Sequence, residues 1–303
     1  MNERLTGVIT PLLTPYNSDF SIAEDLYLKH AAKCLADGAH YLSPFGTTSE
    51  APSHSSAERR AALESLVTSG TAPADRLMPG TGLCSLEETR DLCRHAAELG
   101  CAAVMVLPPF FLKPVDDDGL YRYFSMLIEA LGPKPPRICL YHIPQNTGVP
   151  LSPALASRLN SAFPDIVVAY KDSSGAWDNT AAVIEAAPGV SVFPGSEVLM
   201  PDAMALGGGG CISASCNSNI GAIRALYDHV CDDRSREVQE LVDRVKVHRD
   251  ALSAAGLIPG LKSLKAHQTG DERWLTLRPP LRDADPAIGA RLAETLVLPE
   301  RIS

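Results

Sequence analysis

Short apolar runs alternate with longer amphipathic stretches along the first 230 residues of the chain. The apolar runs are six to eight residues long, and most are apolar at consecutive positions instead of every second one. This pattern is typical of parallel strands that helices cover on both faces. We therefore predict eight strands, at residues 7–13, 39–46, 76–82, 102–108, 137–143, 166–172, 190–196 and 210–215.

The stretches between these runs have apolar residues at helical spacing. Several begin at Ser, Asp or Asn and end before a glycine, which are the usual start and stop signals of helices. Helices are predicted at residues 23–37, 55–69, 85–99, 116–131, 152–161, 176–187, 198–206 and 218–229. After residue 230 only helical patterns remain, at residues 235–254, 259–270 and 286–297.

Eight strand–helix units in about 230 residues match the size of a (β/α)8 TIM barrel. We predict an α/β protein in which residues 1–230 form the barrel with the active site, and residues 231–303 form a C-terminal helical extension packed on it. The alternative is a doubly wound open sheet. No glycine-rich fingerprint follows the first predicted strand, so a dinucleotide site of that fold is not supported.

Charge and composition narrow the class of partner. The 303 residues carry a formal net charge of −9, which does not favour binding to nucleic acid or to an anionic membrane. The apolar run near the N-terminus is short and contains Pro11 and Pro15, unlike a signal peptide or a membrane span. We expect a soluble, cytoplasmic protein whose partner is a small molecule.

The eight cysteines show no metal-binding or disulfide pattern. The sequence contains neither C-x-x-C nor H-E-x-x-H, so no metal site is predicted. We expect buried, reduced thiols at Cys34, Cys84, Cys93, Cys101, Cys139, Cys211, Cys216 and Cys231.

In a TIM barrel the chemistry lies at the carboxyl ends of the strands, and Lys171 occupies such a position in VVAYKDSSG. The other seven lysines fall on predicted helices or in proline-rich loops, where we expect solvated ammonium groups. Burial of an amine favours its neutral form, which can attack a carbonyl and form a Schiff base. The alternative is a structural ion pair of Lys171 with Asp172 or Glu197.

Three further segments are candidates for the site. Tyr141 ends the preceding strand, so its phenol could shuttle protons beside Lys171, or it could be a core tyrosine. Thr47 and Thr48 supply hydroxyl and N–H groups suited to a small carboxylate, or they form an ordinary capped turn. His142 should point to the other face of its strand and be structural. The glycines at 207–210 are predicted to form a tight turn with close backbone approach.

Five motifs in this order resemble the dihydrodipicolinate synthase/N-acetylneuraminate lyase family of class I, pyruvate-dependent aldolases. They are GTTSEA (46–51), PPFFLKP (108–114), LYHIPQNTG (140–148), YKDSSG (170–175) and GSEVLMPDAMALGGGGCIS (195–213). The resemblance covers the whole predicted barrel and continues into the helical tail. It implies a (β/α)8 barrel that assembles as a homotetramer, a dimer of dimers.

The same resemblance implies roles for individual residues. Lys171 would form the imine with pyruvate or another 2-oxo acid, and Tyr141 would relay protons. Thr47 and Thr48 would bind the 2-oxo acid, with backbone contact near Ile212. Gly195 would leave room for the substrate. The covalent imine would replace any metal or organic cofactor.

Three departures from the family pattern bear on the substrate. Asn146 stands where dihydrodipicolinate synthases have an arginine that grips a second carboxylate, and an amide cannot replace a bidentate guanidinium. Phe111 stands where those synthases have a tyrosine that reaches the neighbouring subunit's relay. Ser49 replaces a glycine after the paired threonines. These departures argue against a true dihydrodipicolinate synthase.

The resulting prediction is a lyase that cleaves or forms a 4-hydroxy-2-oxo acid, with pyruvate and an aldehyde as the other partners. The residues predicted to line the aldehyde half of the site are Asn146, Ser173, Gly195, Ser196 and Asn217. The alternatives are a 2-oxo-3-deoxy sugar acid dehydratase using the same imine, a dihydrodipicolinate synthase, and a non-catalytic barrel that binds 2-oxo acids. A pyridoxal phosphate enzyme would also use a lysine imine, and it would be yellow.

Overall fold

The computed structural model describes residues 4–232 and 235–296, which form two compact units. The first unit comprises residues 4–7 and 73–212, and the second comprises the remaining described residues. Both units combine parallel strands with helices. Within the described residues, no helix combines the length and the apolar character needed to span a membrane.

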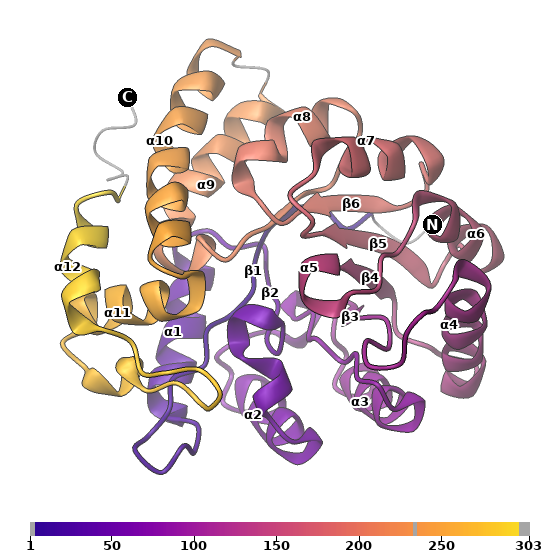
Figure 1. Cartoon of the computed structure of the whole chain (residues 1–303), viewed down its shortest axis with the longest axis horizontal. Helices are drawn as coiled ribbons and strands as arrows, with labels where there is room; N and C mark the ends of the chain where they lie inside the picture. The colour runs from indigo at the N-terminus through magenta and orange to yellow at the C-terminus, as the bar shows by residue number, and fades with distance from the viewer. Residues whose placement is uncertain (1–3, 233–234, 297–303) are drawn as a thin grey trace. The chain divides into compact units, whose positions relative to one another are not determined.

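A parallel four-stranded sheet forms the core of the first unit. Its strands are β3 (Val104–Val106), β4 (Ile138–His142), β5 (Val167–Asp172) and β6 (Ser191–Pro194), in this order, and β7 (Gly210–Ile212) follows later in the chain. Figure 1 shows the unit's longer helices along the outer side of this sheet. These are α3 (Leu86–Glu98), α4 (Asp117–Leu131), α6 (Pro153–Ala162) and α7 (Trp177–Ala186), with the shorter α5 (Pro144–Thr147) and α8 (Met200–Ala205) between strands.

Three helices of the first unit, α3, α4 and α6, begin at the predicted capping residues. The side chains of Ser85, Asp116 and Ser152 each accept a hydrogen bond from the backbone N–H three residues further on. Such caps satisfy N–H groups that have no partner within the helix. The start signals in the sequence therefore predict the first residues of these helices to within one position.

The predicted strand at 76–82 does not form a regular strand. It lies parallel to β3 through two backbone hydrogen bonds, from Thr81 to Met105 at 2.9 Å and from Met105 to Pro79 at 2.8 Å. Pro79 has no N–H to donate, so the ladder is interrupted there. The other seven predicted strands are present among the described residues, although they are shorter than predicted.

The glycine-rich turn before β7 is confirmed as a site of close backbone approach. Gly210 has a φ of +134°, and a Cβ atom at this position would lie 2.1 Å from the carbonyl oxygen of Gly7. Only glycine fits both the backbone conformation and the space. The segment therefore serves packing, as predicted.

The second unit joins two strands to six longer helices. In β1 (Gly7–Thr10), Ile9 and Thr10 pair in parallel with β2 (Tyr41–Leu42). Apolar residues of the N-terminal and C-terminal segments share one core, which includes Leu13, Leu261 and Trp274. The helices are α1 (Glu24–Ala36), α2 (Ser56–Thr68), α9 (Cys216–Cys231), α10 (Ser235–Ala254), α11 (Leu257–Thr269) and α12 (Pro286–Ala293).

Three sequence expectations need correction or limits. The stretch predicted as a helix at 198–206 is a 3-10 turn, Glu197–Leu199, followed by α8. All eight cysteines lie in the described residues and none forms a disulfide, but Cys84 and Cys231 are exposed and Cys101 is only half-buried. The predicted last helix ends at Ala293, and its expected end at residue 297 lies outside the described residues.

Candidate active site

Lys171 and Tyr141 meet at the carboxyl ends of two neighbouring strands in the first unit. They are direct partners in the parallel register of β5 and β4 (Figure 1), so their side chains leave the sheet on the same face. The Lys171 Nζ lies 4.2 Å from the centre of the Tyr141 ring. Only 4% of Lys171 and 2% of Tyr141 is exposed. The structure thus brings together the predicted nucleophile and the predicted proton relay.

The carboxylate next to Lys171 in sequence is committed to other partners. Asp172 accepts hydrogen bonds from the Ser174 backbone N–H at 2.9 Å, from Asn179 at 2.9 Å and from the Thr180 hydroxyl at 2.7 Å. Among the described residues, the Lys171 ammonium forms no ion pair, either with Asp172 or with Glu197. The structural ion pair considered for Lys171 is therefore absent, and the ammonium contacts the Tyr141 ring instead.

His142 lies on the opposite face from Tyr141, as strand alternation predicts. Its Nδ1 accepts a hydrogen bond from the Leu151 backbone N–H at 3.0 Å, and its ring stacks on the Tyr170 ring with 5.8 Å between the ring centres. Burial lowers the pKa of His142, and nearby Asp172 opposes that shift. The residue stabilises the outer face of the sheet and takes no part in the contact between Lys171 and Tyr141.

Gly195 and Ser196 follow β6 beside the end of β5. The Gly195 backbone N–H donates to the Asp172 carbonyl at 2.6 Å. A Cβ atom at Gly195 would lie 2.8 Å from the Ser173 hydroxyl, so close packing of the two strand ends by itself requires glycine here. The Ser196 hydroxyl accepts from the Val198 N–H and caps the 3-10 turn at 197–199. Both residues are half-buried.

The short helix α5 carries Asn146, which is exposed to solvent. Two hydrogen bonds hold α5 in place: Gln145 donates to the Ser173 carbonyl at 2.7 Å, and Lys113 donates to the Thr147 carbonyl at 2.9 Å. The sequence did not predict α5, because its four residues sit in a proline-containing loop too short to show periodicity. Ile212 is buried at the end of β7 in the same unit.

Thr47 and Thr48 belong to the second unit, so their place in one site with Lys171 stays a prediction. They form a 3-10 turn, Thr47–Ser49, in which Thr47 is half-buried and Thr48 is buried. The residues of this segment with positive φ are Phe45 and Glu50, so serine fits at position 49 without strain. The Ser49 hydroxyl donates to the Leu12 carbonyl, which ties the turn to the chain after β1.

A buried charge cluster holds the end of this turn. The Lys262 Nζ lies 2.5 Å from a Glu50 carboxylate oxygen, and the Arg278 backbone N–H donates to the other oxygen at 3.0 Å. Lys262 also lies 4.1 Å from the centre of the Tyr16 ring. Glu50 is 3% exposed and Lys262 is fully buried. The cluster therefore fixes the left-handed residue Glu50, which lies two positions after Thr48.

The sequence missed this cluster. Lys262 and Lys265 were expected to be solvated, yet both are buried, so the expectation that Lys171 alone leaves water is wrong. Both residues lie on a helix whose charged positions look like an ordinary solvated face, and their partner elements are distant in sequence. Burial lowers the pKa of Lys262 to about 8, although Glu50 opposes the shift.

No metal site emerges among residues 4–232 and 235–296. No three histidine, cysteine, aspartate or glutamate side chains in these segments are grouped so that they could hold a metal ion.

Residues 4–297 match the model of the dihydrodipicolinate synthetase family, so the chain belongs to this family. Its members are lyases of the class I Schiff-base type. The resemblance inferred from the five motifs is confirmed.

Individual relatives agree with this assignment. The chain is 34% identical to an uncharacterised DapA-like lyase of Chloroflexus aurantiacus, and the alignment covers 91% of this chain and 90% of the relative. It is 35% identical over 70% of its length to 4-hydroxy-tetrahydrodipicolinate synthase of Thermus thermophilus, 69% of which is covered.

The fold agrees as well. The crystal structure of dihydrodipicolinate synthase from Agrobacterium tumefaciens superimposes with a TM-score of 0.87 at 32% identity, over 96% of this chain and 98% of that one. The chain therefore has the (β/α)8 fold with a helical C-terminal part, and the open doubly wound sheet is excluded.

Proposed function

We propose that this protein is a class I lyase that cleaves or forms a 4-hydroxy-2-oxo acid through an imine on Lys171. One observation carries the proposal: Lys171 is buried at a strand end without an ion pair, and its ammonium lies against the ring of Tyr141, its register partner on the neighbouring strand. A buried ammonium without a carboxylate partner is costly for stability alone, so its position favours a chemical role.

In the cleavage direction, the neutral Lys171 amine attacks C2 of the substrate and forms a carbinolamine. Tyr141 transfers the protons that allow water to leave, which gives a protonated imine. Tyr141, or a water beside it, then takes the proton of the C4 hydroxyl and the C3–C4 bond breaks. The aldehyde leaves while the bond's electron pair forms an enamine. Protonation at C3 and hydrolysis of the imine release pyruvate and the free amine.

The remaining proposed contacts concern substrate binding. Thr47 and Thr48 bind the carboxylate of the 2-oxo acid, and the backbone near Ile212 completes that end. Asn146, Gly195 and Ser196 line the aldehyde end. The covalent imine supplies the electron sink, so the reaction needs neither a metal nor an organic cofactor.

The named relatives include 4-hydroxy-tetrahydrodipicolinate synthases, but two residues favour a different substrate. Asn146 lacks the positive charge that a second carboxylate would need, and Phe111 has no phenolic proton. The dehydratase is the second candidate, because it would share every step up to the imine.

We also propose that the chain works as a homotetramer. Phe111 is 78% exposed and the neighbouring Leu112 is 77% exposed. Two adjacent large apolar side chains open to water are typical of a surface that another protein chain covers. Size-exclusion chromatography with light scattering tests this, and Phe111→Lys should shift the mass toward smaller species if this loop lies at the interface.

The decisive experiment is borohydride reduction in the presence of pyruvate, followed by peptide mapping. Mapping matters because Lys262 and Lys265 are also buried amines. We expect one stable adduct, on Lys171, which is absent from Lys171→Ala. An adduct on another lysine, or none, would overturn the proposal.

Products then separate the remaining alternatives. Incubation with 4-hydroxy-2-oxo acids should release pyruvate and an aldehyde. A deoxygenated 2-oxo acid of unchanged carbon number would instead identify a dehydratase. An adduct on Lys171 without turnover of any 2-oxo acid in a broad panel would identify a binding protein.

A further inference from the structure

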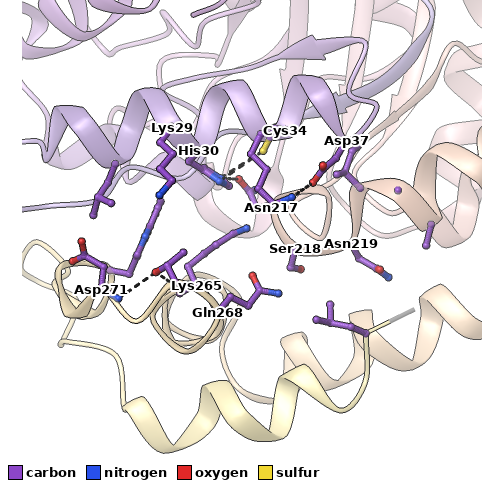
Figure 2. Close-up of a pocket in the computed structure, with 18 residues that line it drawn as sticks. Lys29, His30, Cys34, Asp37, Asn217, Ser218, Asn219, Lys265, Gln268 and Asp271 are labelled. Atoms are coloured by element: carbon purple, nitrogen blue, oxygen red, sulfur yellow. Dashed lines mark hydrogen bonds and ion pairs between the residues drawn. The ribbon is translucent and has the colours of Figure 1, made fainter. Parts of the chain in front are cut away.

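The second unit contains a pocket that the proposed catalytic residues do not line. It has a volume of about 830 Å³ and lies among α1, α9, α11 and the 3-10 turn Glu272–Leu275. Figure 2 shows polar side chains of α1 facing those of α9 and α11 across it. Pockets of this volume are typical of small-molecule sites.

Lys265 reaches into this pocket without a partner. It is 6% exposed, and its side chain runs from α11 toward the segments that carry Cys34 and Asn217 (Figure 2). Within the described parts of the chain, its ammonium makes no hydrogen bond and no ion pair. Burial lowers the pKa of Lys265. An ammonium in this position lacks the acceptor that would compensate for its lost water.

The acidic groups around the pocket are already paired. Asp37 forms an ion pair with Lys33 at 2.7 Å, and Asp271 forms one with Arg273 at 2.8 Å. Neither carboxylate is therefore free to neutralise Lys265. Lys29 adds a second positive charge at the exposed edge of the pocket.

Asn217 and His30, two buried neutral groups of the lining, already have partners. The side-chain oxygen of Asn217 accepts a hydrogen bond from the Leu13 backbone N–H at 3.1 Å and lies 2.9 Å from the His30 Nε2. The side-chain NH2 group of Asn217 donates to two backbone carbonyls. Burial and the charge of Lys265 lower the pKa of His30 to about 3, so this ring is uncharged at neutral pH. Lys265 therefore carries a buried charge without a counter-ion among the described residues, and the Asn219 Nδ2 and Trp274 Nε1 donors of the lining also lack hydrogen-bond partners.

Apolar side chains form the rest of the wall. Leu26, Ile220, Trp274 and Leu296 line the pocket beside Lys265. We propose that the pocket binds a small organic carboxylate, with its carboxylate on Lys265 and its apolar part against Leu26 and Trp274. A free inorganic anion would satisfy Lys265 but would leave the apolar wall in contact with water, so an organic acid fits better.

Trp274 provides a direct optical readout of this site. The chain has two tryptophans, Trp177 and Trp274, so Trp177→Phe leaves Trp274, which lines the pocket, as the single tryptophan. In this background, hexanoate, acetate and inorganic phosphate are titrated as probes while Trp274 fluorescence is recorded. We expect hexanoate to change the emission in a saturable way, and acetate and phosphate to bind more weakly.

Two variants test the assignment. Lys265→Met removes the charge but keeps a long apolar side chain, and it should weaken hexanoate binding by about tenfold or more. Gly221→Leu adds apolar volume at the pocket wall, where a Cβ atom would meet nothing within 4 Å, and it should also weaken binding. Lys246→Met changes an exposed lysine on α10 and should leave binding unchanged.

Three results would overturn the proposal. One is that no probe changes the emission at concentrations up to about 10 mM, because a functional site should bind its ligand with a dissociation constant in the millimolar range or lower. Another is that Lys265→Met and Gly221→Leu, both folded, bind hexanoate as the parent does. The third is that Lys171→Ala abolishes binding, because the probe would then occupy the catalytic site. Retained binding in Lys171→Ala supports a separate pocket.

Discussion

Lys171 on β5 and Lys262 on α11 are both withdrawn from water, yet their surroundings differ. The Lys262 ammonium lies 2.5 Å from a Glu50 oxygen and donates to the Thr276 carbonyl at 2.9 Å. The Lys171 ammonium lies over the Tyr141 ring and has no carboxylate among the described residues. Both contact an aromatic ring, so the carboxylate is the difference.

This difference separates a structural amine from a reactive one. A carboxylate at hydrogen-bond distance stabilises the charged form of lysine and occupies the protons that a nucleophile must lose. An aromatic ring attracts the ammonium more weakly and leaves the nitrogen accessible after deprotonation. Lys265 is also buried without an ion pair, so neither property alone identifies a Schiff-base lysine. Lys171 differs by its place at a strand end with a tyrosine ring against its ammonium.

The largest expected effect concerns the reactive lysine. Lys171→Ala should lower the rate of pyruvate formation by about 10³-fold or more, because no other group can form the imine. The free energy of unfolding should stay the same or rise, since a buried ammonium without a partner is removed. Enzyme assays and urea denaturation measure the two effects. The exposed Lys134→Ala serves as the control and should change neither.

The paired lysine should show the opposite behaviour. Lys262→Met leaves Glu50 buried without its cation, and the free energy of unfolding should fall by about 3–5 kcal/mol. Urea denaturation measures this loss. Adding Glu50→Gln to Lys262→Met should recover part of the stability, because the buried negative charge disappears as well. If Lys262→Met were as stable as the parent, the ion pair would not hold the turn after Thr47 and Thr48.

Tyr141→Phe separates the ring from its hydroxyl. The phenyl ring keeps the contact with the Lys171 ammonium, so the free energy of unfolding should change by less than about 1 kcal/mol. Imine formation should slow by about 10²-fold, the usual contribution of one general acid–base group. Time-resolved borohydride trapping with pyruvate measures this rate. An unchanged trapping rate would assign the proton transfer to another group.

Local sequence rules predicted the part of the candidate site that lies on neighbouring strands. A continuous apolar run ending in Lys171, preceded by one ending in Tyr141, determines that the two side chains share a face once the strands pair in parallel. Helix starts at Ser85 and Ser152 followed from capping chemistry.

The cluster around Glu50 could not be predicted in this way. Lys262 and Arg278 are more than 200 residues from Glu50 in the chain, and no periodicity links them. A charged residue on an amphipathic helix is normally solvated, so only tertiary structure shows that this one is not. The same reason explains why the burial of Lys265, and with it the pocket of the second unit, could not be predicted.

The smallest predicted effect concerns the exposed edge of the Glu50 cluster. Arg278 donates to the Glu58 carboxylate, and this contact lowers the pKa of Glu58 from 4.5 to about 2. A carboxyl whose pKa is lower in the folded state contributes stability above pH 4.5 and loses that contribution as the pH falls toward 2. Glu58 is partly exposed, so solvent screening keeps the contribution at about 1 kcal/mol or less.

Glu58→Gln tests this contribution through its pH dependence. At pH 7 the variant should be less stable than the parent by that small amount, and the difference should shrink as the pH is lowered toward 2, because the Glu58 carboxyl becomes increasingly protonated. Urea denaturation at several pH values measures the difference, with the exposed Glu98→Gln as the control. A difference of unchanged size at pH 2 would show that Glu58 acts by packing and not by charge. The edge of the cluster would then differ from its centre, where Lys262 and Glu50 are held by their opposite charges.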